Sequence, residues 1–476
     1  MKMREKMAIA LLVIGFLVFT VPGLEAKEIK VKCDKGESVQ KELDKLDGPA
    51  TIVVTGTCHE YLEIKKDDVT IQGGTYLPPT PPDPNRNIIF INSARRVSIT
   101  GVIITGGRSG ISVYQGGSLT LDNSTISEAT SYGVLLSYGA SVNINACIIQ
   151  QNTLEGVMVT NNSALNLTKS TITANRRTGI VVTRSSSAQL GHSASGVPGL
   201  NTITDNLGNG LSITRSAFAS IDNNTITGNS SIGLEIEGAS ATVTNNTIAH
   251  NQWGIIVANS GNARIGIDEV QSAGPNTIEN NVYEGILIMN SAAAYMLANT
   301  IRSNGQTTGR PGVNINRANG QLIGDNKIQE NGGHGVAVSL GALLQGVGGF
   351  NITAGPDVIK ENGHSGIYGW NNASLDIRSA EVTNNVQNGI VLSLQSTLRI
   401  YGATVSDNGK TTPGVIGHGI VLWDGSSVAR YSTDYPRDTI TGNSGWGIIC
   451  HGESTLVGGT GASGVSGNTA GNVNCP

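Results

Sequence analysis

Apolar and polar positions along this chain follow one short pattern that recurs about fourteen times. Each repeat opens on a glycine before two alternating apolar residues. It continues with a second alternating segment and ends on a Thr-Ile pair with an asparagine three residues beyond the isoleucine. Residues 133–152 show the pattern, with Ile148 in the place of the threonine, as GVLLSYGASVNINACIIQQN. The opening glycines are Gly110, Gly133, Gly156, Gly179, Gly210, Gly233, Gly254, Gly285, Gly312, Gly335, Gly366, Gly389, Gly419 and Gly447. A period of this length is typical of stacked units, none of which folds alone.

Each repeat contains three short strand-like segments, which we call a, b and c in chain order. They are rich in β-branched residues and separated by turn residues, and the repeats lack helical periodicity. Asn-Gly hairpin dipeptides are absent from most joints, which disfavours an antiparallel sheet of hairpins. Wrapping each repeat into one coil stacks equivalent strands in parallel about 4.8 Å apart. About fourteen such coils would form a rod on the order of 65 Å long.

One asparagine keeps its place relative to segment c even where the repeat length varies. It is found at Asn152, Asn175, Asn206, Asn229, Asn251, Asn281, Asn304, Asn331, Asn362, Asn385, Asn408 and Asn443. Stacked side-chain amides can hydrogen-bond to one another and satisfy backbone groups at a turn. We therefore expect a structural ladder of asparagines.

The phrase Gly-Ile-x-Val followed by Asn-Thr-Ile-x-x-Asn, over residues 90–470, resembles the right-handed parallel β-helix repeat proteins of the pectin-lyase-like superfamily. The resemblance implies an all-β fold, a single-stranded right-handed parallel β-helix of about fourteen coils. Val39, Leu43 and Leu46 lie on one helical face, which predicts an N-terminal capping helix. We expect a signal peptide at 1–26, a cap with the first strands at 27–76, a Pro-rich loop at 77–87 and the β-helix at 88–476.

Residues 1–26 have the plan of a secretory signal, with a basic start, an apolar stretch and a small-residue cleavage site. An uncleaved anchor is the alternative, although the apolar stretch is short for a membrane span. No second such stretch follows. We therefore expect a secreted, periplasmic or cell-surface protein without a membrane span after signal cleavage.

Charged residues make up 14% of the chain and the formal net charge is −4, so there is no electrostatic basis for binding nucleic acid. The histidines are scattered without metal-ligand spacing, and we expect no metal and no other cofactor.

Cys33 with Cys58 and Cys450 with Cys475 lie near the two ends, so in an oxidising compartment we expect two disulfides. Cys147 occupies an apolar-pattern position and is expected to be a buried thiol.

Three repeats are longer because they carry extra residues between segments b and c, at 192–200, 267–275 and 346–356. Insertions at a shared corner would stack into a wall beside strand c, and loops on a rigid scaffold often carry function. Drift of loops that tolerate insertion explains the same pattern.

A charged run lies beside segment c on five consecutive repeats. Its members are Glu279, Arg302, Lys327, Glu330, Lys360, Glu361 and Glu381. By resemblance to the polysaccharide lyases of this superfamily, Arg302, Lys327 and Lys360 are candidates for a catalytic base and for neutralising a uronate carboxylate. The signs alternate, however, which favours a ladder of exposed ion pairs.

Aromatic residues gather at or just beyond segment a in the last repeats. Tyr368, Trp370, Trp423 and His451, with Asp424 as a hydroxyl acceptor, are the candidate substrate-binding residues. Exposed rings in a row form a stacking surface for sugars. The alternative is that the tryptophans only cover the end of the rod.

The outward position of segment a is often apolar, where a solvated strand should alternate. The positions are Leu135, Met158, Val181, Ile256, Leu287, Val391, Val421 and Ile449. This stripe indicates a contact surface that could mediate self-association. Close packing by β-branched residues is the alternative.

Taken with the resemblance, these features favour a secreted protein that binds extracellular or cell-surface polysaccharide without evident catalysis, because no acid–base pair stands out. One alternative is a polysaccharide lyase or epimerase acting on uronate-containing glycans. The other is a structural surface rod.

Overall fold

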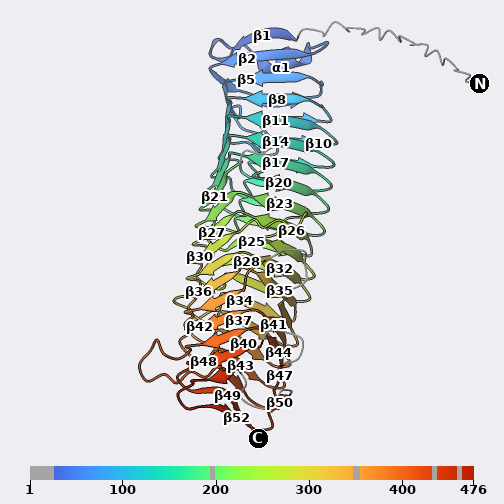
Figure 1. The fold of residues 1–476 in the computed structure, drawn as a ribbon. Helices are drawn as coiled ribbons and strands as arrows, with labels where there is room; N and C mark the ends of the chain where they lie inside the picture. The colour runs from blue at the N-terminus through green and yellow to red at the C-terminus, as the bar shows by residue number, and fades with distance from the viewer. Residues whose placement is uncertain (1–25, 193–198, 347–353, 431–436, 458–463) are drawn as a thin grey trace, which may run out of the picture.

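The computed structural model describes residues 26–192, 199–346, 354–430, 437–457 and 464–476. Figure 1 shows a long rod of stacked coils that starts at one end with the N-terminal strands and finishes at the other with the C-terminus. The expected signal segment lies outside the described residues except for its last position. Within the described ranges no helix combines the length and apolar character needed to cross a membrane.

The described strands form three long parallel sheets, which we call sheets a, b and c after the three segments of the repeat. Sheet a contains β4 (Leu62–Ile64), β7 (Ile89–Asn92), β10 (Ile111–Tyr114), β13 (Val134–Ser137), β16 (Val157–Val159), β19 (Ile180–Val182), β22 (Leu211–Thr214), β25 (Ile232–Glu237), β28 (Trp253–Ala258), β31 (Ile286–Met289), β34 (Val313–Asn316), β37 (Val336–Ser339), β40 (Ile367–Trp370), β43 (Ile390–Ser393), β46 (Ile420–Leu422), β49 (Trp446–Cys450) and β52 (Gly471–Asn474).

Sheet b contains β1 (Lys27–Lys32), β2 (Ala50–Thr55), β5 (Val69–Gln72), β8 (Val97–Thr100), β11 (Ser118–Asp122), β14 (Ser141–Asn145), β17 (Ala164–Thr168), β20 (Ser187–Leu190), β23 (Phe218–Asp222), β26 (Ser240–Thr244), β29 (Asn262–Ile265), β32 (Ala293–Leu297), β35 (Asn319–Gly324), β38 (Leu343–Gly346), β41 (Ser374–Arg378), β44 (Thr397–Tyr401), β47 (Ser427–Arg430) and β50 (Thr455–Val457).

Sheet c contains β3 (Thr57–His59), β6 (Thr75–Leu77), β9 (Ile103–Thr105), β12 (Thr125–Ser127), β15 (Ile148–Gln150), β18 (Thr171–Thr173), β21 (Asn201–Thr204), β24 (Asn224–Thr227), β27 (Thr247–Ala249), β30 (Thr277–Glu279), β33 (Thr300–Arg302), β36 (Lys327–Gln329), β39 (Val358–Lys360), β42 (Glu381–Thr383), β45 (Thr404–Ser406), β48 (Thr439–Thr441) and β51 (Val465–Ser466).

Equivalent positions of successive repeats are paired neighbours in these sheets. Val134 pairs with Val157 in sheet a, and Ile149 pairs with Ile172 in sheet c. All three segments of one repeat therefore wrap once around the axis before the next coil begins. The prediction of an all-β, single-stranded parallel β-helix is confirmed, and parallel pairing in sheet b already begins at β1 with β2.

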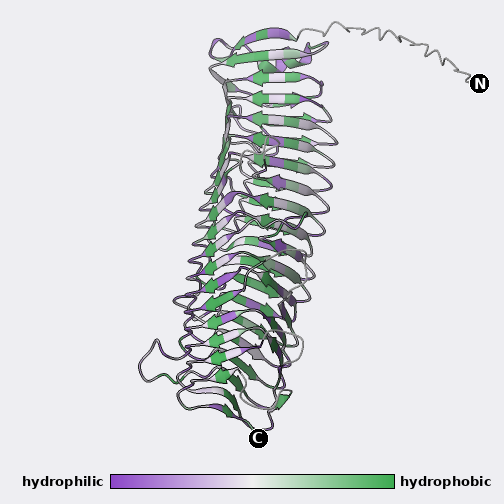
Figure 2. Cartoon of the chain, in the orientation of Figure 1, coloured by the Kyte–Doolittle hydropathy of each residue, from purple (hydrophilic) through white to green (hydrophobic). Residues whose placement is uncertain are grey.

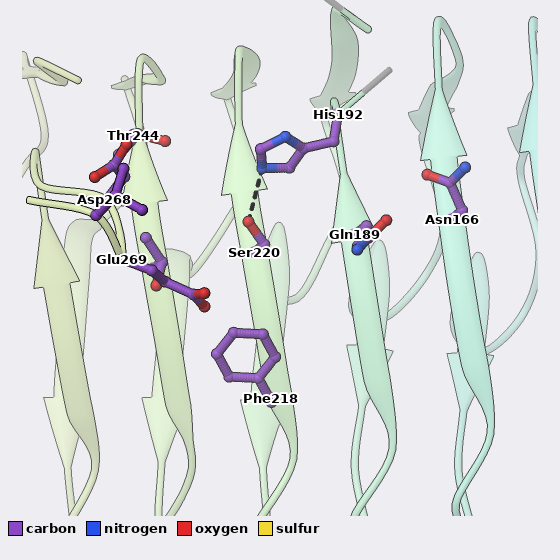
Figure 3. Close-up of a pocket in the computed structure, with 10 residues that line it drawn as sticks. Asn166, Gln189, His192, Phe218, Ser220, Thr244, Asp268 and Glu269 are labelled. Atoms are coloured by element: carbon purple, nitrogen blue, oxygen red, sulfur yellow. Dashed lines mark hydrogen bonds between the residues drawn. The ribbon is translucent and has the colours of Figure 1, made fainter. Parts of the chain in front are cut away.

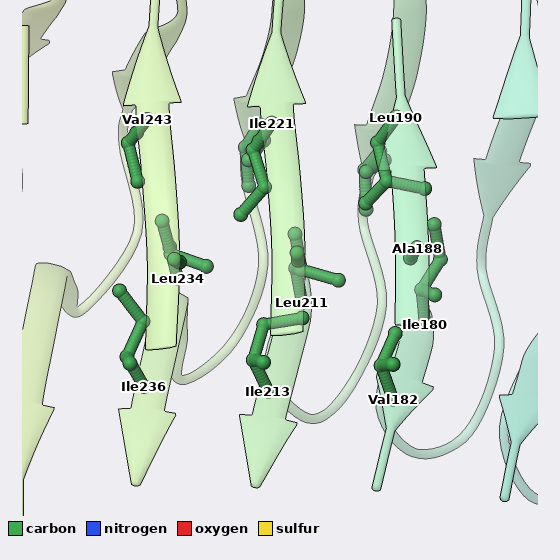
Figure 4. Close-up of a cluster of buried hydrophobic side chains, with 14 of the residues drawn as sticks. Ile180, Val182, Ala188, Leu190, Leu211, Ile213, Ile221, Leu234, Ile236 and Val243 are labelled. Atoms are coloured by element: carbon green, nitrogen blue, oxygen red, sulfur yellow. The ribbon is translucent and has the colours of Figure 1, made fainter. Parts of the chain in front are cut away.

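The inward side chains form one continuous apolar core along the axis. Figure 4 shows a section of it, where Ile180, Leu211 and Leu234 from sheet a face side chains of sheet b such as Ile221. Figure 2 shows the same apolar positions running along the strands of the whole rod. Because each such side chain is completely buried, each contributes roughly 1.5–3 kcal/mol relative to exposure. The rod therefore gains stability coil by coil.

The asparagine ladder of the sequence lies at the corner between sheets c and a. Asn152 donates from Nδ2 to Oδ1 of Asn175 at 2.9 Å, and Asn175 does the same to Asn206 at 2.9 Å. The ladder continues to Asn443, which donates to Asn468 at 2.9 Å. Each amide is buried, and its oxygen also accepts the main-chain N–H of the preceding asparagine, as between Asn152 and Asn175 at 3.1 Å.

A second polar ladder lies at the corner between sheets b and c. It includes Asn201, Asn224, Asn246, Asn276, Asn299, Asn326 and Asp357, linked through side-chain hydrogen bonds of 2.7–3.0 Å. Cys147 occupies the same corner in an earlier coil, where its main-chain N–H donates to Oγ of Ser170 at 3.0 Å. The thiol is free and buried, and burial raises the pKa of Cys147 to about 11.

The opening glycines are required by the asparagine ladder. A Cβ at Gly233 would lie 2.7 Å from Cγ2 of Ile248 and 2.8 Å from Nδ2 of Asn251 in the next coil. The coil that contains β7 lacks this restriction. Ile88 precedes β7 at the opening position there, and Gly107 stands at the ladder position of the following coil, where a Cβ would lie 2.8 Å from Ile88. The regular coils consequently extend further toward the N-terminus than the opening glycines do.

Both ends of the rod carry a disulfide. Cys33, in the short 3-10 helix η1 (Cys33–Lys35), is bonded to Cys58 of β3, and Cys450 of β49 is bonded to Cys475 after β52. At the N-terminal end, helix α1 (Val39–Asp44) begins after Ser38, whose Oγ accepts the main-chain N–H of Lys41. Its buried residues Val39 and Leu43 belong to the core.

Candidate functional site

Three of the predicted substrate-binding residues occupy one row on the outer face of sheet a. Trp370 pairs with Ser393, and the register of the following strands continues this row through Trp423 to His451. Since successive coils are about 4.8 Å apart, the two tryptophans are separated by roughly 10 Å along the rod. The small side chain of Ser393 lies between them.

The two tryptophan rings of this row are accessible. The Trp423 ring stacks on His451, with centroids 3.7 Å apart and an angle of 8° between the planes. Trp370 is 37% exposed and Trp423 is 42% exposed. Asp424 follows Trp423 and is also exposed. His418 lies just before β46 (Ile420–Leu422), and its Nδ1 accepts the main-chain N–H of Trp446 at 2.8 Å. Burial and the charge of His451 lower the pKa of His418.

Tyr368 lies on β40 two residues before Trp370, in the neighbouring row. Its ring stacks on His334 with centroids 4.7 Å apart and an angle of 10°. His334 is held below its ordinary pKa, at about 4, first by burial and then by the adjacent His364. Tyr368 is only partly accessible because it packs on a small outer apolar cluster. It is therefore separate from the accessible rings of Trp370 and Trp423.

The apolar stripe of segment a forms part of one outer row of sheet a. Polar residues interrupt it, since Val181 pairs with Ser212, Ser212 with Glu235, and Leu287 with Asn314. Toward the C-terminus the stripe is covered by the chain itself. Val391, Val421 and Ile449 are buried there against Tyr368 and Trp446, with Val421 only 3% exposed. Elsewhere the stripe residues are half-buried.

The charged run lies along the outer face of sheet c. Arg302 forms an ion pair with Glu279 at 2.6 Å between Nε and Oε2. Gln329 separates Arg302 from Lys360 in the same row. Lys327 lies in a different row, two residues earlier along β36, and has no ion pair among the described residues. The three basic candidates therefore do not converge on one point.

A groove of about 540 Å³ lies over the outer face of sheet a in the N-terminal half. Tyr114, Tyr132 and Tyr138 line it, and the Tyr114 and Tyr138 rings are 5.7 Å apart. Burial raises the pKa of Tyr114, so its hydroxyl stays protonated. The basic residues of the groove are Arg108, Arg184 and Arg215, and its acidic residue is Glu237. This groove combines aromatic rings with positive charge.

A hollow of about 620 Å³ lies over the outer face of sheet b, between the first two insertions (Figure 3). His192 enters it from the first insertion, whose residues 193–198 are outside the described ranges. Asp268 and Glu269 enter from the second insertion, which is anchored by Ile267 in a buried cluster with Leu297. The first two insertions thus border a hollow over strand b, whereas the sequence pattern suggested a wall beside strand c.

A family model described as the right handed beta helix region matches residues 87–241, 200–340, 232–427 and 344–469, together well over half of the chain. The chain belongs to the right-handed β-helix family. The predicted right-handed parallel β-helix is thereby confirmed, and the family assignment fits the three parallel sheets.

Several solved structures are similar to this β-helix protein. The pectate lyase Pel9A shares 14% identity with a TM-score of 0.40, and the match covers 57% of this chain and 78% of the lyase. The A-module of the Azotobacter vinelandii mannuronan C-5 epimerase AlgE6 shares 15% identity with a TM-score of 0.31, covering 92% and 94%. A mutant of the periplasmic alginate epimerase AlgG shares 13% identity with a TM-score of 0.35, covering 84% and 83%. At these identities the likeness concerns the fold alone. No curated protein matches the chain.

Sequence reasoning missed two groups of surface residues in this β-helix protein. The aromatic and basic side chains of the sheet a groove come from several coils and from the turns between them. Their signal was the recurrence of tyrosine in early repeats, at Tyr114 and Tyr138. The hollow on sheet b depends on how the insertions cross the sheet, which the repeat pattern does not determine.

Proposed function

We propose that this β-helix protein binds an extracellular or cell-surface polysaccharide along the outer face of sheet a. The observation that carries the proposal is the row in which Trp370 and Trp423 expose their rings on a rigid sheet. An indole face provides a flat apolar surface for the C–H face of a sugar ring, and Asp424 beside it accepts a hydrogen bond from a hydroxyl. Tryptophans that only covered the end of the rod would be more completely buried.

The groove in the other half of sheet a favours a polysaccharide that carries carboxylate groups. Arg108, Arg184 and Arg215 outnumber the single acidic lining residue Glu237. Guanidinium groups bind carboxylates through paired hydrogen bonds, and the neighbouring tyrosines offer further ring surfaces. A long chain lying parallel to the rod axis would contact both regions.

The two end disulfides support an oxidising location, as in the periplasm or outside the cell. Such a location is where polysaccharides of the envelope and the surroundings are found. Binding without bond cleavage is favoured over lyase chemistry because the strongest basic candidate, Arg302, is engaged by Glu279.

The test is a binding panel of neutral and uronate-containing polysaccharides, measured by calorimetry with the secreted form of the chain. We expect Trp370→Ala and Trp423→Ala each to weaken binding by about tenfold or more, which corresponds to about 1.4 kcal/mol. Trp423→Phe should keep most of the affinity because a ring remains. Leu394→Ala is the matched control, since Leu394 is 42% exposed beside the row but offers no ring.

Unchanged affinity in both tryptophan variants would refute binding through this row. The same panel should be followed for the ultraviolet absorbance of unsaturated uronates. Release of such products would refute the non-catalytic proposal and indicate a lyase. Absence of binding to every polysaccharide would leave the structural rod as the better explanation.

A further inference from the structure

A serine, a histidine and an aspartate meet on the outer face of sheet b, away from the aromatic row. Nε2 of His192 lies 2.7 Å from Oγ of Ser220 (Figure 3). Nδ1 of the same ring lies 4.0 Å from Oδ2 of Asp222. Ser220 and Asp222 are two residues apart in β23, so both face outward. The order is that of a nucleophile, a base and a nearby carboxylate.

The backbone before His192 holds the imidazole over β23. Gly191 has a φ of 84°, a conformation that favours glycine, and a Cβ there would collide with the carbonyl oxygen of Asp222. The main-chain N–H of Gly191 donates to the carbonyl of Leu167 at 2.9 Å. The turn after β20 is therefore fixed against the neighbouring coils at the point where His192 begins.

The carboxylate of Asp222 is held by its neighbours. Oδ1 accepts hydrogen bonds from Oγ1 of Thr244 at 2.7 Å and from Nδ2 of Asn245 at 2.8 Å, and Oδ2 accepts one from Asn223. The Asp222 side chain is only 13% exposed, whereas that of His192 is 45% exposed. A fixed, partly buried negative charge can stabilise an imidazolium formed on the accessible His192.

The hollow around Ser220 offers both polar and apolar contacts. Gln189 pairs with Ser220 in sheet b, and Asn166 pairs with Gln189, so their amides lie in the same outer row. Side-chain amides of this kind can donate to an oxygen that becomes negative. On the other side, Phe218 is 40% exposed and precedes Ser220 by two residues, which places an apolar ring beside the hydroxyl.

The shape and charge of the hollow indicate the substrate class. The hollow is open to solvent, so a substituent on a larger molecule can enter it, and Phe218 provides a surface for a short acyl chain. Asp268 and Glu269 on the opposite wall disfavour a negatively charged acyl group. Oδ1 of Asn166 is buried without a hydrogen-bond partner among the described residues, and a sugar hydroxyl could donate to it.

We propose that Ser220, His192 and Asp222 hydrolyse short-chain acyl esters, such as acetyl groups on the hydroxyls of a sugar. Oγ of Ser220 forms a bond to the carbonyl carbon while Nε2 of His192 takes the hydroxyl proton. The ester C–O bond then breaks, and the leaving alkoxide takes that proton from His192. Water next attacks the acyl-serine with His192 as base, releasing the carboxylic acid and restoring Ser220. This reaction does not depend on polysaccharide binding at sheet a.

The probe is para-nitrophenyl acetate with the secreted chain, and the measured quantity is kcat/KM. We expect Ser220→Ala and His192→Gln each to lower kcat/KM by about 100-fold or more. His250→Gln is the matched control, since His250 is exposed outside the hollow and should leave the rate unchanged. A fluorophosphonate should label the wild-type chain on the peptide that contains Ser220.

Labelling needs no variant, so it keeps the proposal testable if a substitution disturbs folding. The proposal is overturned if Ser220→Ala retains the wild-type rate. It is equally overturned if the fluorophosphonate leaves Ser220 unmodified. Loss of glycan binding in the Trp370→Ala variant with esterase activity intact would separate the two proposed surfaces.

Discussion

The Nδ2 and the main-chain N–H of Asn206 both donate to Oδ1 of Asn229, at 3.0 and 3.2 Å. Asn229 in turn donates from Nδ2 to Oδ1 of Asn251 at 3.0 Å and to the carbonyl of Ile203 at 3.1 Å. One buried amide therefore links three successive coils. The loss of any member leaves a neighbouring buried N–H without a partner, which is costly in an interior without water.

We expect Asn229→Ala to destabilise the rod by about 1–3 kcal/mol, because the buried N–H of Asn206 would lose its acceptor. Denaturant unfolding followed by circular dichroism measures this. Asn143→Ala, an exposed strand asparagine, is the control and should change the stability by less than about 0.5 kcal/mol. Equal effects of the two substitutions would contradict a stabilising role of the ladder.

A second prediction concerns the stability contributed by the opening glycines. We expect Gly233→Ala to cost about 1–3 kcal/mol, because the added methyl group would press on Ile248 and on the ladder amide of Asn251. Gly48→Ala is the control, since nothing lies within 4 Å of its Cβ position and its φ is not positive. Melting temperatures of the two variants check the prediction, which fails if Gly233→Ala is as stable as the control.

The repeat pattern predicted the features that depend on vertical stacking. The ladder from Asn152 to Asn443 and the row that joins Trp370, Trp423 and His451 follow from register alone, because residues at equivalent places of successive coils must be neighbours. The second ladder was missed although its signal was present. It is the asparagine directly before Thr-Ile, as in Asn224-Thr225-Ile226, and serine, cysteine or aspartate replaces it in other coils.

Side-chain contacts that involve insertions were not predictable in this way. His192 meets Ser220 because the chain turns back over the next coil at Gly191, and a positive φ at one glycine has no periodic signature. The coil that contains β7 lacks the glycine signature for a different reason. Ile88 stands there in place of the opening glycine, and Gly107 stands in place of the ladder asparagine. The large side chain is thus on Ile88, and the small residue is at the ladder position.

Self-association through the apolar stripe remains a prediction of the sequence, and Leu135 is the place to test it. Leu135, Met158 and Val181 are paired neighbours and half-buried on the outer face of sheet a. If two rods pack there, light scattering should rise with concentration and Leu135→Lys should abolish the rise, because a buried unpaired charge is unfavourable. Thr120→Lys is the control, because it adds the same charge at an exposed position on sheet b. Scattering independent of concentration in the wild-type chain would rule out association.

The C-terminal disulfide should protect the last coil. Cys475 follows β52, whose pairing with β49 has no further strand beyond it among the described residues. We expect the double variant Cys450→Ser and Cys475→Ser to lose about 2–4 kcal/mol of stability, because the unfolded chain gains freedom. Hydrogen exchange should quicken first in residues 471–474. A reductant should quicken exchange at residues 471–474 in the wild-type chain but have no further effect on these residues in the variant, and protection unchanged in the variant would contradict the prediction.

Asp357 occupies a position that asparagine holds in the preceding coils of the second ladder. It is 4% exposed, and its Oδ1 accepts hydrogen bonds from Nδ2 and N of Asn326 at 2.7 and 3.1 Å. Burial raises the pKa of Asp357 to about 6, above the usual value of an unfolded chain. Between about pH 4 and pH 6 the folded protein therefore keeps a proton that the unfolded chain releases, so stability falls as the pH rises through this range.

We expect Asp357→Asn to remove this loss, because a neutral amide accepts the same two hydrogen bonds and needs no proton. The variant should match the wild-type chain near pH 4 and exceed its stability at pH 8 by on the order of 1–3 kcal/mol. Denaturant unfolding at several pH values measures the difference. Asp47→Asn makes the same chemical change at an exposed position and should show no such pH-dependent gain. A constant difference between the Asp357→Asn variant and the wild-type chain from pH 4 to pH 8 would mean that Asp357 does not titrate within that range in the folded rod.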